Sequence, residues 1–203
     1  MSIIVKIKRN RFVRGSYYLF RQTFGYPKRK FGYFGEDVAI NSPNFISHPQ
    51  NVYLMGDNQI GNANILTKNA KFIMKPHSSC GSGLKVATGN HVRIEGRFFR
   101  SITEAEKPAG YDKDVVVETD AWVGMNVTLL AGVTVGRGAT VGTGAVVTKD
   151  IPPYCVAVGS PAKPVKFYWT IDQIIEHEKQ LYPEEERYSR EQLESIFAQY
   201  SKK

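Results

Sequence analysis

The sequence predicts an all-β protein built as a parallel β-helix, and three observations support this prediction. Six six-residue units follow one another without a gap between Val117 and Pro152. The fourth position of each unit is a residue type that tolerates a left-handed backbone at a tight turn. A weaker six-residue rhythm precedes these units, and a polar interruption separates the two. A period of six fits neither a helix nor a simple strand. It is typical of coils that stack and together bury what one coil cannot bury alone.

The basic N-terminal segment, residues 1–35, holds nine Lys or Arg side chains and no acid, whereas the remaining chain balances 18 basic against 19 acidic residues. Aromatic residues are interleaved with these charges. We expect the segment to pack over one end of the β-helix with its charges in water. Alternatively, the segment would bind an anionic membrane surface or a phosphorylated substrate. Nucleic acid is disfavoured, because no binding motif accompanies the charge.

The strands of the β-helix are predicted from the residue that opens each repeat. The regular units open on Val117, Val123, Leu129, Val135, Val141 and Val147. Their fourth positions are Asp120, Asn126, Gly132, Gly138, Gly144 and Asp150. Before them, the weaker rhythm runs through Ile40, Ile46 and Val52 and then, after a slip of two residues, through Leu54, Ile60, Leu66, Phe72 and Leu84. We therefore expect these aliphatic side chains to point inward. A long helix is excluded, since so many Gly, Asn and Asp residues would destabilise it.

An extruded loop is predicted where the rhythm breaks. Leu84 and Val117 are 33 positions apart, which is not a multiple of six, and the residues between are largely charged or turn-forming. Residues from about 90 to 114 should therefore leave the wall of the β-helix. Long ordered loops on a rigid scaffold often carry function.

The C-terminal extension, residues 167–203, is predicted to form α-helices. Thr170 with Gln173, and Ser189 with Gln192, have the spacing of N-terminal capping boxes. Apolar residues at helical spacing follow each box, and Pro183 ends the first run. These apolar stripes would pack against the β-helix or a neighbouring subunit.

Composition bounds the location of the protein. No apolar run approaches the roughly 20 residues that span a membrane, and the first residues do not form a convincing signal peptide. Cys80 and Cys155 suit a reducing compartment and provide neither a disulfide framework nor a metal cluster. We expect a cytoplasmic protein with two buried cysteines and no bound metal.

The repeats and the segments that follow them, Thr148 to Pro153 and Gly159 to Lys163, resemble the hexapeptide-repeat acyltransferases. The resemblance covers residues 36–166 and points to the maltose and galactoside O-acetyltransferase type. Residues 175–186 are also similar to the tails of members from polysaccharide biosynthesis. The resemblance implies a left-handed β-helix, a homotrimer, and acetyl-CoA as co-substrate.

His91 is the candidate catalytic base. In the family that this chain resembles, a Thr-x-x-His motif at the root of an extruded loop supplies the base, and here it is Thr88 to His91. The tryptophan of a following Asp-x-Trp-Val-Gly unit borders the acyl-CoA site, and here it is Trp122. Each residue has a structural alternative: His91 would merely stabilise the loop, and Trp122 would cover a subunit contact. The other histidines occupy predicted turns or a charged helix.

The resemblance also suggests contacts to the co-substrate and the acceptor. Small or hydroxyl-bearing residues on the later coils would let the cofactor lie against the backbone, namely Thr143, Ala145 and Thr148. Cations for the phosphates of CoA would be Lys149, Lys163 and Lys166, in places where the family often has arginine. Asn62 and Asn64 lie beside, not on, the position that contacts the acceptor in related sugar acetyltransferases.

The function expected from this resemblance is transfer of acetyl from acetyl-CoA to a sugar hydroxyl in surface polysaccharide biosynthesis. The basic N-terminal segment would suit a lipid-linked or nucleotide-linked acceptor near the inner membrane. An antibiotic hydroxyl is the alternative acceptor. A zinc enzyme of β-helix type would need three converging histidines, and a closely spaced pair is missing from the sequence. A binding scaffold without catalysis is the remaining alternative.

Overall fold

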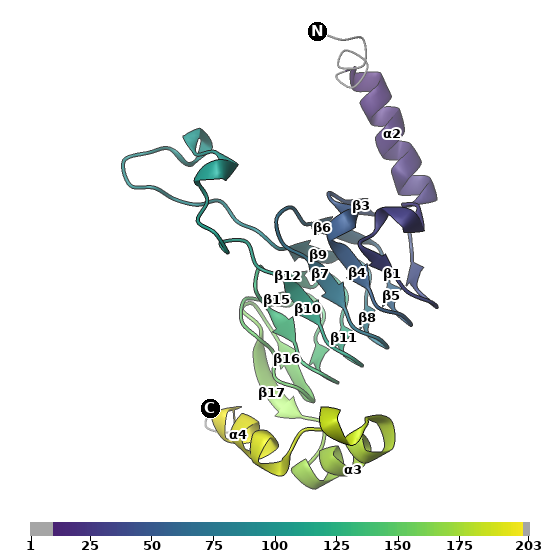
Figure 1. Ribbon diagram of the computed structural model, residues 1–203, viewed down its shortest axis with the longest axis vertical. Helices are drawn as coiled ribbons and strands as arrows, with labels where there is room; N and C mark the ends of the chain where they lie inside the picture. The colour runs from purple at the N-terminus through teal and green to yellow at the C-terminus, as the bar shows by residue number, and fades with distance from the viewer. Residues whose placement is uncertain (1–9, 201–203) are drawn as a thin grey trace.

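The computed structural model describes residues 10–200 and shows a three-sided column of short strands, which confirms the predicted parallel β-helix (Figure 1). The chain visits three sheets in turn. The first sheet contains β1 (Tyr33–Phe34), β4 (Val52–Leu54), β7 (Phe72–Met74), β10 (Val115–Val117) and β13 (Thr134–Val135). The second contains β2 (Ala39–Ile40), β5 (Gln59–Ile60), β8 (Ser79–Cys80), β11 (Trp122–Val123), β14 (Thr140–Val141), β16 (Cys155–Val158) and the antiparallel β17 (Lys163–Phe167). The third contains β3 (Phe45–Ile46), β6 (Ala63–Leu66), β9 (Leu84–Ala87), β12 (Thr128–Leu129) and β15 (Val146–Val147).

The core of the column is built from the repeats as predicted. The residues that open the six regular units are all 0% exposed. Asp120, Asn126 and the three fourth-position glycines adopt positive φ. Asp150 is the exception: its carboxylate instead accepts a hydrogen bond from the backbone N–H of Thr134 at 2.8 Å. Both cysteines are buried in this core, and burial raises the pKa of the Cys155 thiol to about 12.

The coils before the loop are longer than those after it, and this overturns one prediction. After the loop, Val116 pairs with Thr134, eighteen positions on. Before it, Gln59 pairs with Ser79 and Asn64 with Lys85, twenty and twenty-one positions on. The extra residues lengthen β6 to four residues, so that Ala63 and Ile65 point inward. The prediction that Leu66 points inward was wrong, because it lies on the outer side of β6 and is 47% exposed.

The predicted extruded loop leaves the column after β9 and returns at β10 (Figure 1). It contains two short 3-10 helices, η3 (Phe99–Ser101) and η4 (Glu104–Glu106). Although 27 residues separate the two strands, β10 pairs directly with β7 on the preceding coil. The loop is therefore an insertion into an otherwise continuous stack.

The predicted C-terminal helices cover the other end of the column (Figure 1). They are α3 (Ile171–Leu181), the 3-10 helix η5 (Glu184–Glu186) and α4 (Arg190–Tyr200). Both capping boxes form, with Gln173 and Gln192 each accepting from the backbone of its N-cap residue. Ile174 and Leu193 pack with Tyr154 in a small second core.

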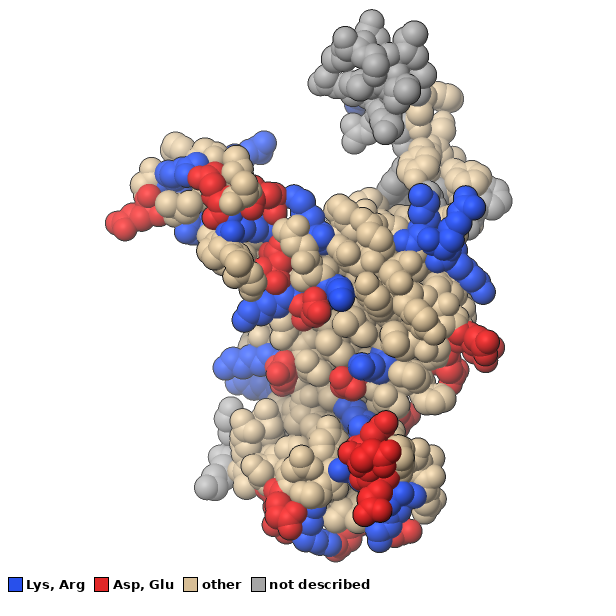
Figure 2. Space-filling view, in the orientation of Figure 1, with Lys and Arg blue, Asp and Glu red and all other residues tan. Residues whose placement is uncertain are grey.

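The N-terminal segment only partly follows its prediction. Residues 1–9 lie outside the described residues. Phe31 is buried against the first coil, next to the 3-10 helix η1 (Lys28–Lys30), so this part does pack over the column. By contrast, α2 (Arg11–Phe24) projects from the column and exposes Phe12, Leu19 and Phe20 (Figure 1). Figure 2 shows Lys and Arg gathered beside its base. None of the helices between residues 10 and 200 is both long and apolar enough to cross a membrane.

Candidate active site

His91 lies exposed at the root of the extruded loop, four residues after Ala87, the last residue of the third-sheet strand β9. Thr88, which follows that strand directly, is buried. A cavity of about 430 Å³ opens beside it. Its walls come from two earlier corners of the column and from the loop: Ser47, His48, Leu66, Thr67, Lys68, Gly89, Asn90, His91, Lys107 and Asp112. The candidate base therefore faces a pocket that is open to a ligand.

The backbone of His91 is held by its neighbours in the loop. Its N–H donates to the side-chain oxygen of Asn90 at 2.8 Å, and its carbonyl accepts from the Tyr111 hydroxyl at 3.3 Å. The imidazole meets the ring of Phe99 nearly edge to face, with 5.5 Å between centroids. These contacts orient the imidazole by packing and leave its nitrogens for a ligand, since no side chain between residues 10 and 200 hydrogen-bonds to them.

Hydroxyl side chains form a ladder along the column, and two of them, Ser47 and Thr67, line the cavity of His91. The Ser47 hydroxyl donates to the Thr67 carbonyl at 2.7 Å and accepts from the Thr67 N–H at 3.0 Å. The Thr67 hydroxyl donates to the His48 carbonyl at 3.0 Å. Thr88 continues the ladder on the next coil by donating to the Ala70 carbonyl at 3.2 Å. The six-residue rhythm does not reveal this ladder, because its residues recur every twenty or twenty-one positions and not every eighteen. Ser47, Thr67 and Thr88 at that spacing were the available signal.

Lys107 and Asp112 both line the cavity and help to hold the loop against the column. The ammonium of Lys107 is 3.0 Å from each Asp112 carboxylate oxygen, and their side chains are 11% and 4% exposed. Asn69, on the column, donates to Asp112 at 2.8 Å and to Glu104 at 3.1 Å. Burial acts to raise the pKa of Asp112, but hydrogen bonds from Lys107 and Asn69 outweigh it and hold the pKa below its ordinary value. The carboxylate is therefore charged and serves as an anchor rather than as a proton acceptor.

His48 shares the cavity with His91, a proximity that the sequence did not indicate. Its Nδ1 lies 3.1 Å from the Ser47 hydroxyl. Within residues 10–200 no three His, Cys, Asp or Glu side chains gather as metal ligands.

Trp122 is placed on a different face of the column from His91. It belongs to β11 in the second sheet, where it pairs with Ser79 and Thr140, and its side chain is 57% exposed. His91 follows a strand of the third sheet, and Trp122 does not line its cavity. One chain by itself therefore does not bring the two together.

The other residues expected at the co-substrate divide between the same two regions. Lys163 and Lys166 are exposed on β17, at the end of the second sheet that holds Trp122. Thr143 is exposed at the turn that follows β14. Thr148 and Lys149 are exposed at the corner after β15, which lies below the corner of His91 along the third sheet.

Ala145 differs from the rest, because its methyl group points into the core and is 0% exposed. Its N–H donates to the Gly142 carbonyl at 3.3 Å, and its carbonyl accepts from the Thr128 N–H at 2.9 Å. Ala145 therefore has no side-chain surface to offer a ligand.

Packing between coils explains why glycine occupies the positions near Trp122, and the sequence pattern did not reveal this. A Cβ added to Gly124 would lie 2.8 Å from the backbone of Thr143 and Val141 on the next coil, and one added to Gly142 would lie 2.8 Å from Val158. The absence of side chains here is required by the close stacking of coils. It is not by itself evidence for a bound cofactor.

Of the two residues predicted to contact the acceptor substrate, the side chain of Asn62 is engaged in a turn and that of Asn64 is exposed. Asn62 uses its side-chain oxygen to accept from the Gly83 N–H at 2.6 Å, so it stabilises the turn between coils. Asn64 is exposed on β6, where it pairs with Phe45 and Lys85. Neither lines the cavity of His91, which uses Leu66, Thr67 and Lys68 from the same coil.

Comparison with known proteins confirms the resemblance to hexapeptide-repeat acyltransferases. The family model for the bacterial transferase hexapeptide (six repeats) matches residues 114–149. The chain is 37% identical over 117 residues to a polysialic acid O-acetyltransferase from Escherichia coli O1:K1 / APEC, which covers 50% of this chain and 38% of that protein. It is 29% identical over 115 residues to a probable macrolide acetyltransferase from Lysinibacillus sphaericus, covering 57% and 62%.

A similar fold is found in a hexapeptide-repeat acetyltransferase from Vibrio cholerae, solved in complex with acetyl-coenzyme A. The TM-score is 0.64 at 22% identity, and the match covers 84% of this chain and 100% of that one. The two curated relatives, in contrast, are matched over less than two thirds of their length. These likenesses identify the β-helix and its repeats, and they give a basis for a functional proposal.

Proposed function

We propose that this chain, a hexapeptide-repeat β-helix, is an acetyl-CoA-dependent O-acetyltransferase that acts on a sugar hydroxyl. The observation that carries the proposal is the position of His91: an exposed imidazole, packed against Phe99, beside a cavity at the root of the extruded loop. The named activities of the relatives and the acetyl-coenzyme A in the Vibrio structure support the same reaction class.

The chemistry asks for a base of this kind. A sugar hydroxyl is too weakly acidic to attack a thioester at neutral pH, and neutral imidazole is well suited to accept its proton. As the hydroxyl oxygen attacks the acetyl carbonyl, His91 takes the proton. It then gives the proton to the departing sulfur of CoA when the tetrahedral intermediate collapses. The acetyl group passes directly to the acceptor, and no acetylated enzyme is needed.

The co-substrate would lie between two columns of a homotrimer. His91 and Trp122 occupy different faces of one chain, so a complete site needs His91 of one subunit beside the Trp122 face of another. Exposed Lys149, Lys163 and Lys166 would meet the phosphates of CoA as point charges. Thr143 and Thr148 would border its pantetheine arm. Ala145 would contribute only through the coil that it helps to pack.

The acceptor that we favour is a sugar of a surface polysaccharide, in accord with the polysialic acid O-acetyltransferase among the relatives. Asn64 is exposed on the sheet that leads to His91 and would be available to such an acceptor, whereas Asn62 is committed to a turn. The free buried cysteines suit a cytoplasmic enzyme. The projecting α2, with exposed Phe12 and Leu19, would allow peripheral contact with an anionic inner membrane.

A second candidate keeps the reaction and changes the acceptor. The probable macrolide acetyltransferase among the relatives favours an antibiotic hydroxyl. Release of free thiol from acetyl-CoA, measured in parallel for sugar and macrolide acceptors, would separate the two. The sugar proposal expects faster release with the sugars.

The test of the base compares the same substitution at two histidines. His91→Asn should lower the rate of acetyl transfer by about 100-fold to 10,000-fold, the usual contribution of a general base. His77→Asn is the matched control, because His77 is an exposed turn residue that pairs with Asp57 and asparagine tolerates its positive φ. Transfer by His91→Asn within about tenfold of wild type would exclude His91 as the base.

A further inference from the structure

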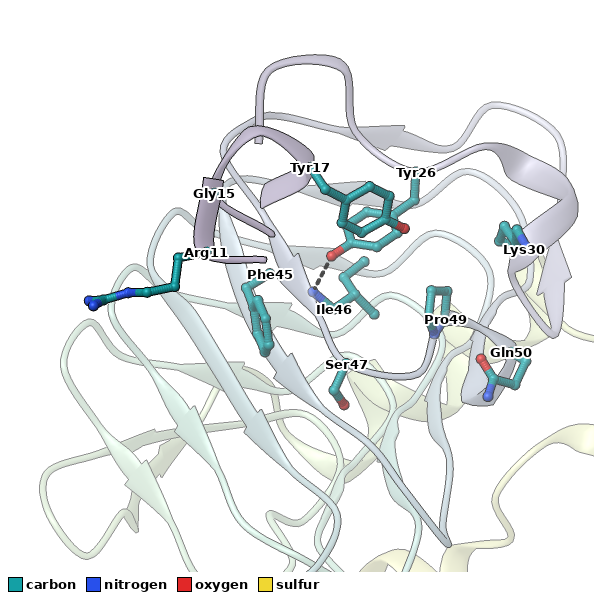
Figure 3. Close-up of a pocket in the computed structure, with 10 residues that line it drawn as sticks. All are labelled: Arg11, Gly15, Tyr17, Tyr26, Lys30, Phe45, Ile46, Ser47, Pro49 and Gln50. Carbon is teal, nitrogen blue, oxygen red and sulfur yellow. Dashed lines mark hydrogen bonds between the residues drawn. The ribbon is translucent and has the colours of Figure 1, made fainter. Parts of the chain in front are cut away.

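A second and larger cavity adjoins the one that holds His91. It measures about 850 Å³ and lies between α2 and the segment from β3 to the following turn (Figure 3). Its lining consists of Arg11, Gly15, Tyr17, Tyr26, Lys30, Phe45, Ile46, Ser47, Pro49 and Gln50. Ser47 lines both cavities, so the two meet along one short stretch of chain.

The walls of this cavity combine aromatic faces with hydrogen-bonding groups. The rings of Tyr17, Tyr26 and Phe45 surround its middle, with Gln50 to one side (Figure 3). Tyr26 is fixed in place, since its hydroxyl accepts a hydrogen bond from the Ile46 N–H at 3.0 Å. Aromatic faces beside polar side chains suit a ligand with both apolar ring faces and hydroxyl groups. Sugar rings have that character.

The charged residues that line the cavity, Arg11 and Lys30, are both basic. Arg11 stands on one side with its guanidinium directed away from the rings, and Lys30 stands on the other (Figure 3). The ten lining residues include no Asp or Glu. Lys28 and Arg29 share η1 with Lys30, and basic side chains gather in this region in Figure 2. A groove lined by one sign of charge attracts ligands of the opposite sign.

We propose that this cavity, formed by Lys30, Tyr26, Phe45 and their neighbours, binds the part of the acceptor that extends beyond the acetylated sugar, and that this part is an anionic glycan. The inference rests on the proposed function and names its substrate class. A chain seated here would pass Ser47 and present one sugar hydroxyl to His91. The anionic groups would be sugar carboxylates or a glycosyl diphosphate, both of which a lysine can pair with.

Binding without acetyl-CoA tests the site independently of catalysis. Calorimetry would measure the affinity of a uronic acid oligosaccharide, a glycosyl diphosphate and a neutral oligosaccharide of matched length. We expect one of the anionic ligands to bind at least about tenfold more tightly than the neutral one, with an affinity that falls as salt rises. Whichever of the two anionic ligands binds more tightly would show whether the negative charge of the acceptor comes from sugar carboxylates or from a diphosphate.

Two variants and one control locate the binding. Lys30→Glu and Phe45→Ala should each lower the affinity of the protein for the anionic ligand by about tenfold or more. Lys179→Glu, an exposed charge reversal on α3 at the far end of the column, should leave its affinity unchanged. Near-native circular dichroism of each variant would exclude misfolding as the cause.

The outcomes separate this inference from the proposed function. Equal binding of neutral and anionic chains, or equal affinity in Lys30→Glu and wild type, would overturn the anionic site even if acetyl transfer to short sugars is observed. Localised binding of an anionic chain with no acetyl transfer to any hydroxyl would uphold the site and overturn the transferase.

Discussion

The ammonium of Lys107 bridges both carboxylate oxygens of Asp112 at 3.0 Å, and both residues line the cavity that His91 also lines. Both residues lie on the returning arm of the extruded loop, and Asp112 joins this arm to the departing arm, since it also accepts from the Asn90 N–H at 3.2 Å. The position of the candidate base therefore depends on an ion pair more than fifteen residues further along the chain.

Lys107→Met should loosen the root of the loop. It leaves the nearly buried Asp112 carboxylate with fewer partners, at a local cost of about 1–3 kcal/mol. Hydrogen exchange of the amides from Gly89 to His91 should accelerate accordingly, and acetyl transfer should fall. Lys179→Met, which removes an exposed pair with Glu176, should change neither. Unaltered exchange in Lys107→Met would show that the pair does not hold the loop.

Glu106 should titrate far below an ordinary glutamate. A hydrogen bond from Arg97, at 2.5 Å, and hydrogen bonds from the backbone and side chain of Thr103 lower its pKa from 4.5 to about 2. Because the folded pKa is depressed, the stabilisation is present above the ordinary value and is lost as the pH falls through about 2. Carboxyl NMR titration would measure the midpoint. A midpoint near 4.5 in wild type would contradict the pairing. Arg97→Met should raise the midpoint above that of wild type but leave it below 4.5, because the hydrogen bonds from Thr103 remain.

Glu178 should hold the C-terminal helices on the column. Its carboxylate, 1% exposed, accepts from the Tyr154 hydroxyl at 2.7 Å and from Arg137 at 3.0 Å. Glu178→Ala would leave the Arg137 charge partly buried and unpaired, so we expect a loss of about 3–5 kcal/mol in the free energy of unfolding. Urea denaturation would measure it. The matched Glu176→Ala should cost less than about 1 kcal/mol, because that side chain is exposed. Equal losses would refute the role of Glu178.

Subunit mixing should reveal a shared active site. If His91 of one chain works with Trp122 of its neighbour, His91→Asn and Trp122→Ala homotrimers should each be impaired. Mixed trimers formed by refolding the two together should regain activity, because some interfaces would then contain both native residues. Light scattering should give three times the mass of one chain. Absence of any recovery in confirmed mixed trimers would place the whole site within one subunit.

The column, its loop and its capping helices could all be predicted from the amino-acid pattern. The repeat from Val117 to Val147 fixes which side chains are buried, and turn residues such as Asn126 and Gly132 fix where the chain bends, because both depend on local chemistry alone. Thr170 and Ser189 marked the helix starts for the same reason. The break in phase after Leu84 marked the loop.

The surroundings of His91 became visible only in the folded chain. Ser47, Thr67 and Asp112 reach its cavity from different coils and from the far arm of the loop, and the longer early coils shifted Leu66 outward. It also placed Trp122 on another face and Ala145 in the core. Such neighbours depend on how many residues each coil takes and how the coils stack, and a pattern read along the chain contains no measure of distance between coils.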